Sequence, residues 1–219
     1  MIPCARDDDD RAGRLRAGCT RRTDGAPGGP AREPPATRTL RASAVASIAL
    51  FYFYGGLEAA TGLWAATLLI SSRGLSQAAA GALVAGYWAA LTVGRFALGA
   101  MTERLGAARV VSTSVWTALA ACLFLSLPET PAWFVALALA LLGIGLAPIY
   151  PLVMHDTPTR FGAEVAGKLV GYQVAAATVG VATLPWLVGA VAEHGSPLLI
   201  PVCLSAIVLL LTCAEWARR

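Results

Sequence analysis

The sequence predicts an all-α integral membrane protein, a bundle of six transmembrane helices, and three observations support this prediction. The 219 residues are 57% hydrophobic and only 14% charged, with a mean hydropathy of +0.64, whereas soluble domains are about 25% charged. Charged residues concentrate at the start of the chain, where residues 1–41 hold nine of the 17 basic and six of the 13 acidic residues. The remainder consists of long apolar blocks separated by short polar breaks.

Residues 1–42 are predicted to form a disordered, basic cytoplasmic segment, and residues 43–219 the transmembrane domain. The first segment is rich in Arg, Gly, Pro and Asp and has almost no large apolar residues, a composition typical of disorder. It lacks the apolar run of a signal peptide, and the acidic run 7–10 interrupts it. We expect either a linker between two domains or an extended start of the chain.

Six apolar blocks supply the six predicted helices: residues 44–70, 77–101, 109–127, 131–154, 166–191 and 197–217. Each block is long enough, because about 20 helical residues cross a hydrocarbon core of about 30 Å. Inside lipid every backbone polar group needs a partner, so such blocks must be helical, and barrel strands would be shorter and alternating. The predicted breaks are Ser71–Ser76, Thr102–Ala108, Pro128–Glu129, His155–Val165 and Glu193–Ser196.

The first two helices contain the only ionisable residues that lie well inside predicted spans, Glu58 and Arg95. A charge at the bilayer centre costs about 3 kcal/mol, so we expect these side chains to face a cavity or each other. Burial disfavours the ionised form of a carboxyl group, which makes Glu58 a candidate for carrying protons or for binding a solute. A structural hydrogen bond of Glu58 remains the alternative, and for Arg95 we favour a structural role near the interface.

Glycine and proline residues predict breaks in the fourth and fifth helices. The fourth helix contains Gly143, Gly145, Pro148 and Pro151, and the fifth contains Gly171, Gly180 and Pro185. Such residues let membrane helices kink or approach closely. A bundle around a cavity and simple close packing both fit this pattern.

Polar and aromatic side chains within the spans are the candidates for lining a solute pathway. Aromatic rings with a polar edge suit stacking and hydrogen bonding of sugars or other amphipathic solutes, although near helix ends they are more often interfacial anchors. Together with Glu58, we select four of them: Trp64, Trp88, Tyr150 and Gln173.

The distribution of basic residues predicts that both ends of the chain are cytoplasmic. With a cytoplasmic N-terminus, eight basic residues flank the inner helix ends and only Arg73 lies in an outer loop, which is the asymmetry that the positive-inside rule requires. The inner residues are Arg38, Arg41, Arg104, Arg109, Arg160, Lys168, Arg218 and Arg219. We therefore expect a multi-pass protein of the cell membrane with an even number of spans.

The stretch Gly94–Arg109, with the sequence GRFALGAMTERLGAAR, resembles the signature loop of the major facilitator superfamily. The resemblance implies a conformational-switch loop formed by Arg95, Gly99, Glu103, Arg104, Gly106 and Arg109. In such a loop an acidic residue and glycines clamp neighbouring helix ends in one of two states. Glu103 stands where the family more often has Asp, which keeps the charge but lengthens the side chain.

Three further stretches resemble helices of the fucose-permease-like branch of that superfamily. Residues 55–64 (GGLEAATGLW) resemble its seventh helix, residues 143–151 (GIGLAPIYP) its tenth, and residues 171–173 with 184–186 its eleventh. The resemblance covers residues 43–217 and implies the C-terminal six-helix half of a facilitator-type transporter. It implies alternating access, a sugar or similar small polar solute, and proton symport with Glu58 as the carrier. Because the superfamily builds its solute site between two halves, we expect a missing half, a homodimer or a longer gene product to complete the site.

Other function classes find less support in the sequence. An efflux transporter for amphipathic compounds and a non-transporting membrane fragment both remain open. An intramembrane protease needs a glycine-flanked serine and a membrane-embedded histidine, but His155 and His194 lie at helix boundaries, so we expect no enzyme activity. The chain lacks the GxxxxGK[ST] loop of an ATP-driven pump.

Five scattered cysteines argue against a disulfide framework or a metal site. No cofactor is expected, and the basic residues form no nucleic-acid-binding face.

Overall fold

The computed structural model describes residues 36–127 and 130–219, which contain helices and no strand. Residues 1–35 and the predicted break Pro128–Glu129 lie outside the described residues. The elements, in chain order, are α1 (Ala36–Arg73), α2 (Gln77–Leu105), α3 (Ala107–Leu125), α4 (Ala132–Leu146), α5 (Ile149–Phe161), α6 (Ala163–His194), the short 3₁₀ helix η1 (Pro197–Leu199) and α7 (Ile200–Arg218). The all-α fold class is confirmed, and α1 begins ahead of the predicted domain boundary at residue 43.

Five segments of the described chain are long and apolar enough to cross a membrane: Leu40–Arg73, Ala107–Leu125, Ala132–Phe161, Ala163–His194 and Pro197–Arg218. The remaining long helix, α2, has 29 residues, which is sufficient length for a crossing. It is rich in Ala and Gly and contains Arg95, Glu103 and Arg104. The structure therefore supports a multi-pass membrane protein, and the sixth span remains a prediction.

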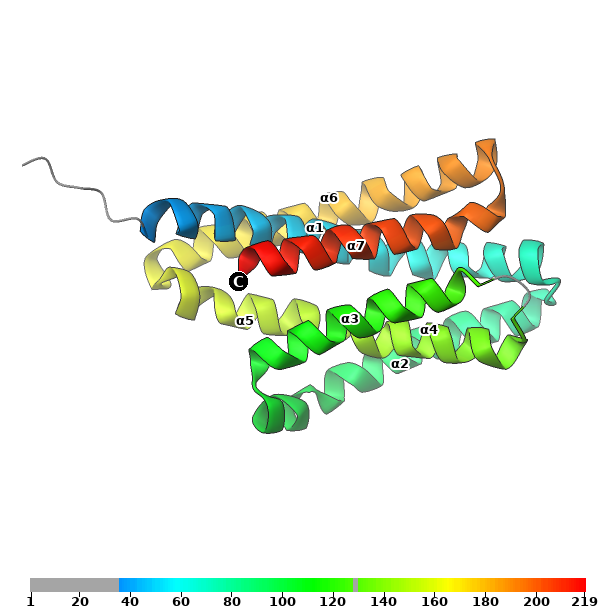
Figure 1. Cartoon of the computed structure of the whole chain (residues 1–219), viewed down its shortest axis with the longest axis horizontal. Coiled ribbons are helices and arrows are strands. Elements are labelled where there is room, and N and C mark those ends of the chain that lie inside the picture. Colours follow the sequence, from blue (N-terminus) through cyan, green and yellow to red (C-terminus); the bar gives the residue numbers. More distant parts are fainter. Residues whose placement is uncertain (1–35, 128–129) are drawn as a thin grey trace, which may run out of the picture. The chain divides into compact units, whose positions relative to one another are not determined.

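Packing among the helices is uneven. The most extensive contact joins α1 to α6, α1 also packs against α7, and α4 lies against α2 and α3. Leu50, Leu57 and Leu204 belong to one contiguous buried core. Figure 1 shows the helices running alongside one another, with the start of α1 and the C-terminus at the same end of the bundle.

Four of the five polar breaks are shorter than predicted, because polar and charged residues prolong the helices instead of ending them. The exception is Pro128–Glu129, where α3 already ends at Leu125 and α4 begins at Ala132. Of the predicted break Thr102–Ala108, only Gly106 separates α2 from α3, and of His155–Val165 only Gly162 separates α5 from α6. Both glycines have a positive φ, 80° and 84°, a conformation that strains any residue with a Cβ. At each junction the glycine N–H bonds the helix that ends and its carbonyl bonds the helix that begins. Helix termination is therefore set by backbone conformation at one residue.

The fourth predicted helix is broken, as its glycines and prolines indicate, whereas the fifth is not. Ala147 and Pro148 form a turn between α4 and α5. Helix α6 continues through Pro185 without interruption, so the expectation of a broken fifth helix is wrong. The Pro185 carbonyl accepts a hydrogen bond from the Trp64 indole of α1 at 2.7 Å.

Candidate functional site

A cavity of about 760 Å³ lies among α1, α2, α5 and α6. Its size falls within the usual range for small-molecule sites, roughly 300–1,000 Å³. The lining consists mostly of apolar and aromatic side chains around one ion pair. The lining residues are Tyr54, Gly55, Glu58, Ala59, Trp88, Arg95, Tyr150, Pro151, Val174, Ala177, Thr178 and Val181. Three of the five predicted pathway residues, Glu58, Trp88 and Tyr150, are thereby brought together.

The ion pair joins Glu58 of α1 to Arg95 of α2. Arg95 Nη2 donates to both carboxylate oxygens of Glu58, at 3.4 and 3.3 Å, and to the Tyr54 hydroxyl at 3.3 Å. The Tyr54 hydroxyl in turn donates to Glu58 Oε2. The two charged side chains thus face each other and also line the cavity, which is the arrangement expected for charges inside a membrane. Arg95 lies with the cavity residues and not with the predicted switch loop.

Two tyrosines fix the position of Glu58. Tyr54 lies one helical turn before Glu58 on α1, and this spacing puts both on one face of the helix. The hydroxyl of Tyr87, a fully buried residue of α2, donates to the backbone carbonyl of Glu58 at 3.3 Å. Helices α1 and α2 are therefore tied together on both the side-chain and the backbone side of Glu58.

Aromatic rings form two walls of the cavity. The Tyr150 ring lies 4.8 Å from the Phe51 ring and 5.7 Å from the Tyr54 ring, measured between centroids. Trp88 packs edge-on against Tyr87 at 5.1 Å. Gly62 makes room for Trp88, since a Cβ at that position would lie 2.5 Å from the indole. These rings offer stacking surfaces beside the ion pair.

The other two predicted pathway residues lie elsewhere. Trp64 lines a second cavity of about 520 Å³ together with Trp186 and Glu193. Gln173 is fully buried and lines neither cavity. Its amide donates to Ser47 at 2.7 Å and to Thr157 at 3.1 Å, which connects α6 to α1 and α5. Gln173 is satisfied by protein partners, as expected of a buried amide.

The predicted switch residues lie along α2 and at its junction with α3. Gly99 falls within α2, and Gly106 is the junction itself. Glu103, Arg104 and Arg109 are exposed, and within the described part of the chain no ion pair joins them to another residue. The clamp that the resemblance implies is thus not formed by charge pairing in this structure.

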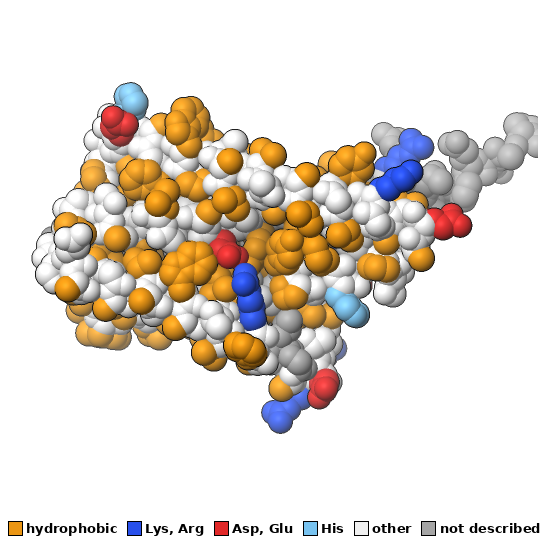
Figure 2. All heavy atoms as spheres, turned by 180° about the vertical axis from the view of Figure 1, so that it is seen from behind, with side chains coloured by type: hydrophobic (Ala, Val, Ile, Leu, Met, Phe, Trp, Pro, Cys, Tyr) orange, Lys and Arg blue, Asp and Glu red, His pale blue; other side chains and the backbone are white. Residues whose placement is uncertain are grey.

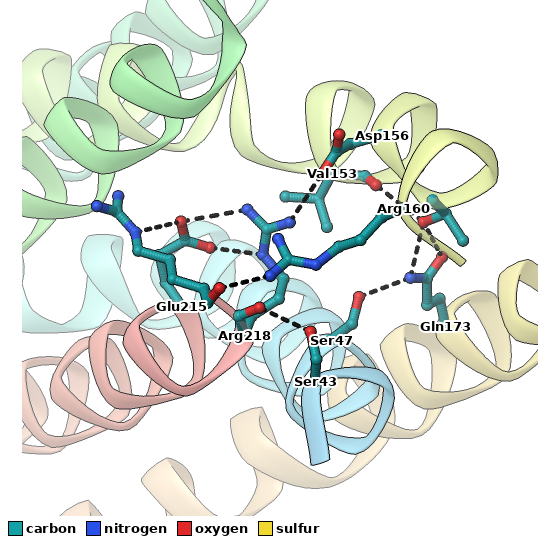
Figure 3. Close-up of polar contacts among 10 residues, drawn as sticks. Ser43, Ser47, Val153, Asp156, Arg160, Gln173, Glu215 and Arg218 are labelled. Atoms are coloured by element: carbon teal, nitrogen blue, oxygen red, sulfur yellow. Dashed lines mark hydrogen bonds and ion pairs between the residues drawn. The ribbon is translucent and has the colours of Figure 1, made fainter. Parts of the chain in front are cut away.

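A second charge network, which the sequence reasoning missed, lies near the C-terminus (Figure 3). Arg218 donates to Glu215 at 2.8 and 3.2 Å and to Asp156 of α5 at 3.1 Å. The backbone carbonyl of Arg218 accepts from Ser43 of α1 at 2.7 Å. Glu215 and Arg218 are both buried. Their spacing of three residues on one helix face was the available signal.

Within the described ranges, no cluster of three or more His, Cys, Asp or Glu residues could hold a metal ion. Figure 2 shows one face of the molecule, where charged side chains meet within a largely apolar surface. A small amphipathic molecule would find at the first cavity both apolar walls and a charged group. The arrangement is therefore suited to binding such a molecule.

The sequence of the chain matches a known protein family. Residues 46–218 match a family model described as Major Facilitator Superfamily. Bypass of stop codon protein 6 of Saccharomyces cerevisiae is similar to the chain, with 28% identity over 191 residues. The matched region covers 81% of this chain and 37% of the yeast protein, so the chain spans little more than a third of that relative's length.

Proposed function

The chain belongs to the Major Facilitator Superfamily, and on that premise we propose that it forms one half of a membrane transporter. The half corresponds to the C-terminal six helices of the fucose-permease-like branch. It moves a small solute, a sugar or a similar polar molecule, by alternating access coupled to protons. The cavity around Glu58 and Arg95 carries this proposal.

Charge placement supports a role in transport. Glu58 and Arg95 are the ionisable residues of a cavity whose other lining residues carry no charge, and charged side chains within membrane bundles commonly mark solute or proton pathways. Glu58 is the proposed proton carrier, with Trp88 and Tyr150 contacting the solute. Trp64 and Gln173 take structural roles in this proposal, because their polar groups bond Pro185, Ser47 and Thr157.

The cavity is open on one side, since Arg95, Trp88 and Val181 are exposed in the isolated chain. In transporters with two repeated halves the solute site lies between the halves, near the bilayer midplane. We propose that a second six-helix half, or a second copy of this chain, closes the open side. The short share of the yeast relative that the chain spans is in keeping with a second half.

The proposed topology has six crossings, with α2 as the sixth span and both termini in the cytoplasm. The start of α1 and the C-terminus lie at the same end of the bundle (Figure 1), as an even number of crossings requires. The α2–α3 junction, with Glu103, Arg104 and Arg109, lies at this end too. There it would be positioned to contact the second half during switching, and the cell membrane is the proposed location.

Efflux of amphipathic compounds is the second candidate. The mostly apolar and aromatic lining favours it, because apolar walls bind hydrophobic bodies without demanding many hydrogen bonds. A fragment that does not transport is the third possibility.

Reconstitution into proteoliposomes tests the proposal. The chain is reconstituted alone and together with any six-helix partner that copurifies. An inward proton gradient is then imposed across the liposome membrane, and uptake of radiolabelled fucose and of a set of amphipathic dyes is measured. Uptake of fucose that depends on the gradient and is lost in Glu58→Gln supports proton-coupled sugar transport. Full proton-coupled uptake by Glu58→Gln would exclude Glu58 as the carrier. Dye movement without sugar uptake would favour the efflux candidate, and movement of neither would favour the fragment.

A further inference from the structure

We infer that the cavity selects small ring-bearing carboxylates, and that Arg95 binds the carboxylate of the solute in place of Glu58. This inference rests on the proposed transport function, and it replaces the neutral sugar proposed above with a carboxylate as the solute. It is argued from the unequal accessibility of the two charges and from the chemistry of the cavity walls.

Arg95 is the more accessible charge. Its side chain is 47% exposed, whereas that of Glu58 is 19% exposed. A guanidinium has five N–H donors, yet the bonds that Arg95 makes within the described residues all come from Nη2. The donors on Nε and Nη1 make no hydrogen bond within the described residues, and Arg95 is one of the residues that line the cavity. A solute that approaches the ion pair therefore meets unfilled donors first.

Glu58 has no comparable capacity. Oε2 accepts from both Tyr54 and Arg95, and Oε1 accepts from Arg95. A cationic solute would find one acceptor position left on Oε1 and would also lie beside the guanidinium. A carboxylate, by contrast, can take two parallel N–H donors from arginine, the strongest pairing available to either group. The geometry thus favours an anionic head on the solute.

The walls favour a flat or apolar body. Trp88 and Tyr150 present rings, and Ala59, Ala177 and Val181 present methyl groups. The Thr178 hydroxyl is already bonded to the Val174 carbonyl at 3.0 Å. A neutral solute with many hydroxyl groups would find few partners at these walls, and unpaired polar groups in such a site lower affinity. A ring that bears one carboxylate would contact the apolar walls through the ring and Arg95 through the carboxylate.

Binding measurements with benzoate and its neutral isostere benzamide test the inference. The full chain is purified in nanodiscs, and affinities are measured by saturation-transfer NMR. Benzoate should bind about tenfold more tightly than benzamide, since hydrogen bonds to charged groups are roughly twice as strong as neutral ones. Equal binding of the two compounds, or binding of neither, would overturn the inference.

Three variants assign the preference to the proposed residues. Arg95→Gln should abolish the preference for benzoate, and Arg95→Lys should retain part of it, because the charge remains without the paired donors. Glu58→Gln should strengthen benzoate binding by up to about fivefold, because the competing carboxylate is gone and an exposed pair contributes at most about 1 kcal/mol. The control is Lys168→Gln, which removes one positive charge from an exposed position of α6 and should change nothing.

The outcomes separate the inference from the proposed function. A preference for benzoate that survives in Arg95→Gln contradicts the inference even if transport is demonstrated. Uptake of fucose without binding of benzoate supports transport and contradicts the inference. Arg95-dependent benzoate binding without uptake of any solute supports the inference as a binding property and contradicts transport.

Discussion

The two charge networks of this protein differ in what surrounds them. In the cavity, Glu58 and Arg95 meet at 3.3 Å, and the arginine is half exposed. Near the C-terminus, Arg218 and Glu215 meet at 2.8 Å, and their side chains are only 6% and 5% exposed. The buried arginine has donors on Nε, Nη1 and Nη2 occupied by carboxylates, whereas the cavity arginine uses one nitrogen. The comparison indicates that the first network is available to a ligand and the second holds helices together.

Glu215→Ala should produce the largest loss of stability. Removing one partner of a buried ion pair leaves an uncompensated charge and costs about 3–5 kcal/mol. The free energy of unfolding, measured by denaturant titration in mixed micelles, is expected to fall by about 3 kcal/mol, because the Asp156 carboxylate still bonds Arg218.

Asp156→Asn is the matched comparison for this variant. The Asp156 side chain is 41% exposed, so its pair should contribute less than about 1 kcal/mol. If the two variants were equally destabilising, burial would not be what distinguishes the partners of Arg218.

Gln173→Leu should have an intermediate effect. This substitution leaves Ser47 without its amide donor and removes one partner of Thr157, and a buried unsatisfied polar group costs about 1–3 kcal/mol. The unfolding free energy should fall by about 2 kcal/mol, measured in the same titration. Double replacement with Ser47→Ala should recover part of the loss. No recovery would show that the amide contributes through packing alone.

Glu58→Gln should have the smallest effect on stability and the largest effect on transport. The half-exposed pair contributes at most about 1 kcal/mol, and Gln can still accept from Tyr54. We expect unfolding to change by less than about 1 kcal/mol while gradient-driven uptake is lost. A loss of stability equal to that of Glu215→Ala would remove the distinction between the two networks.

Much of the fold follows from composition, because long apolar blocks can only be helices in lipid. Five predicted blocks each coincide largely with one long helix, and the block 131–154 is divided between α4 and α5. The break at Pro148 was foreseeable from its neighbouring glycines. The exact helix ends were not foreseeable. Gly106 and Gly162 end their helices through a positive φ, and the charged residues around them do not indicate which residue adopts it. The polar character of a segment indicates where it leaves the lipid, and not where its helix ends.

The site was predictable only as far as helical periodicity was applied. Tyr54 lies one turn from Glu58 and shares its face, whereas Trp64 is six residues on, about 240° around the helix. This rotation accounts for the place of Trp64 at the second cavity. Gln173 could not be placed from sequence, because its partners Ser47 and Thr157 come from helices α1 and α5. Pairing between distant segments, as between Asp156 and Arg218, leaves no local signal.

The single-residue junction at Gly106 also bears on how the protein is made. Helix α2 contains Arg95 and is less apolar than α3. Because the polar stretch between their apolar parts is short, residues 102–108, we expect the two helices to enter the membrane together as a hairpin. Biogenesis of the helix that carries the cavity arginine then depends on its neighbour. A substitution that impairs membrane insertion of α3 is then expected to impair insertion of α2 as well.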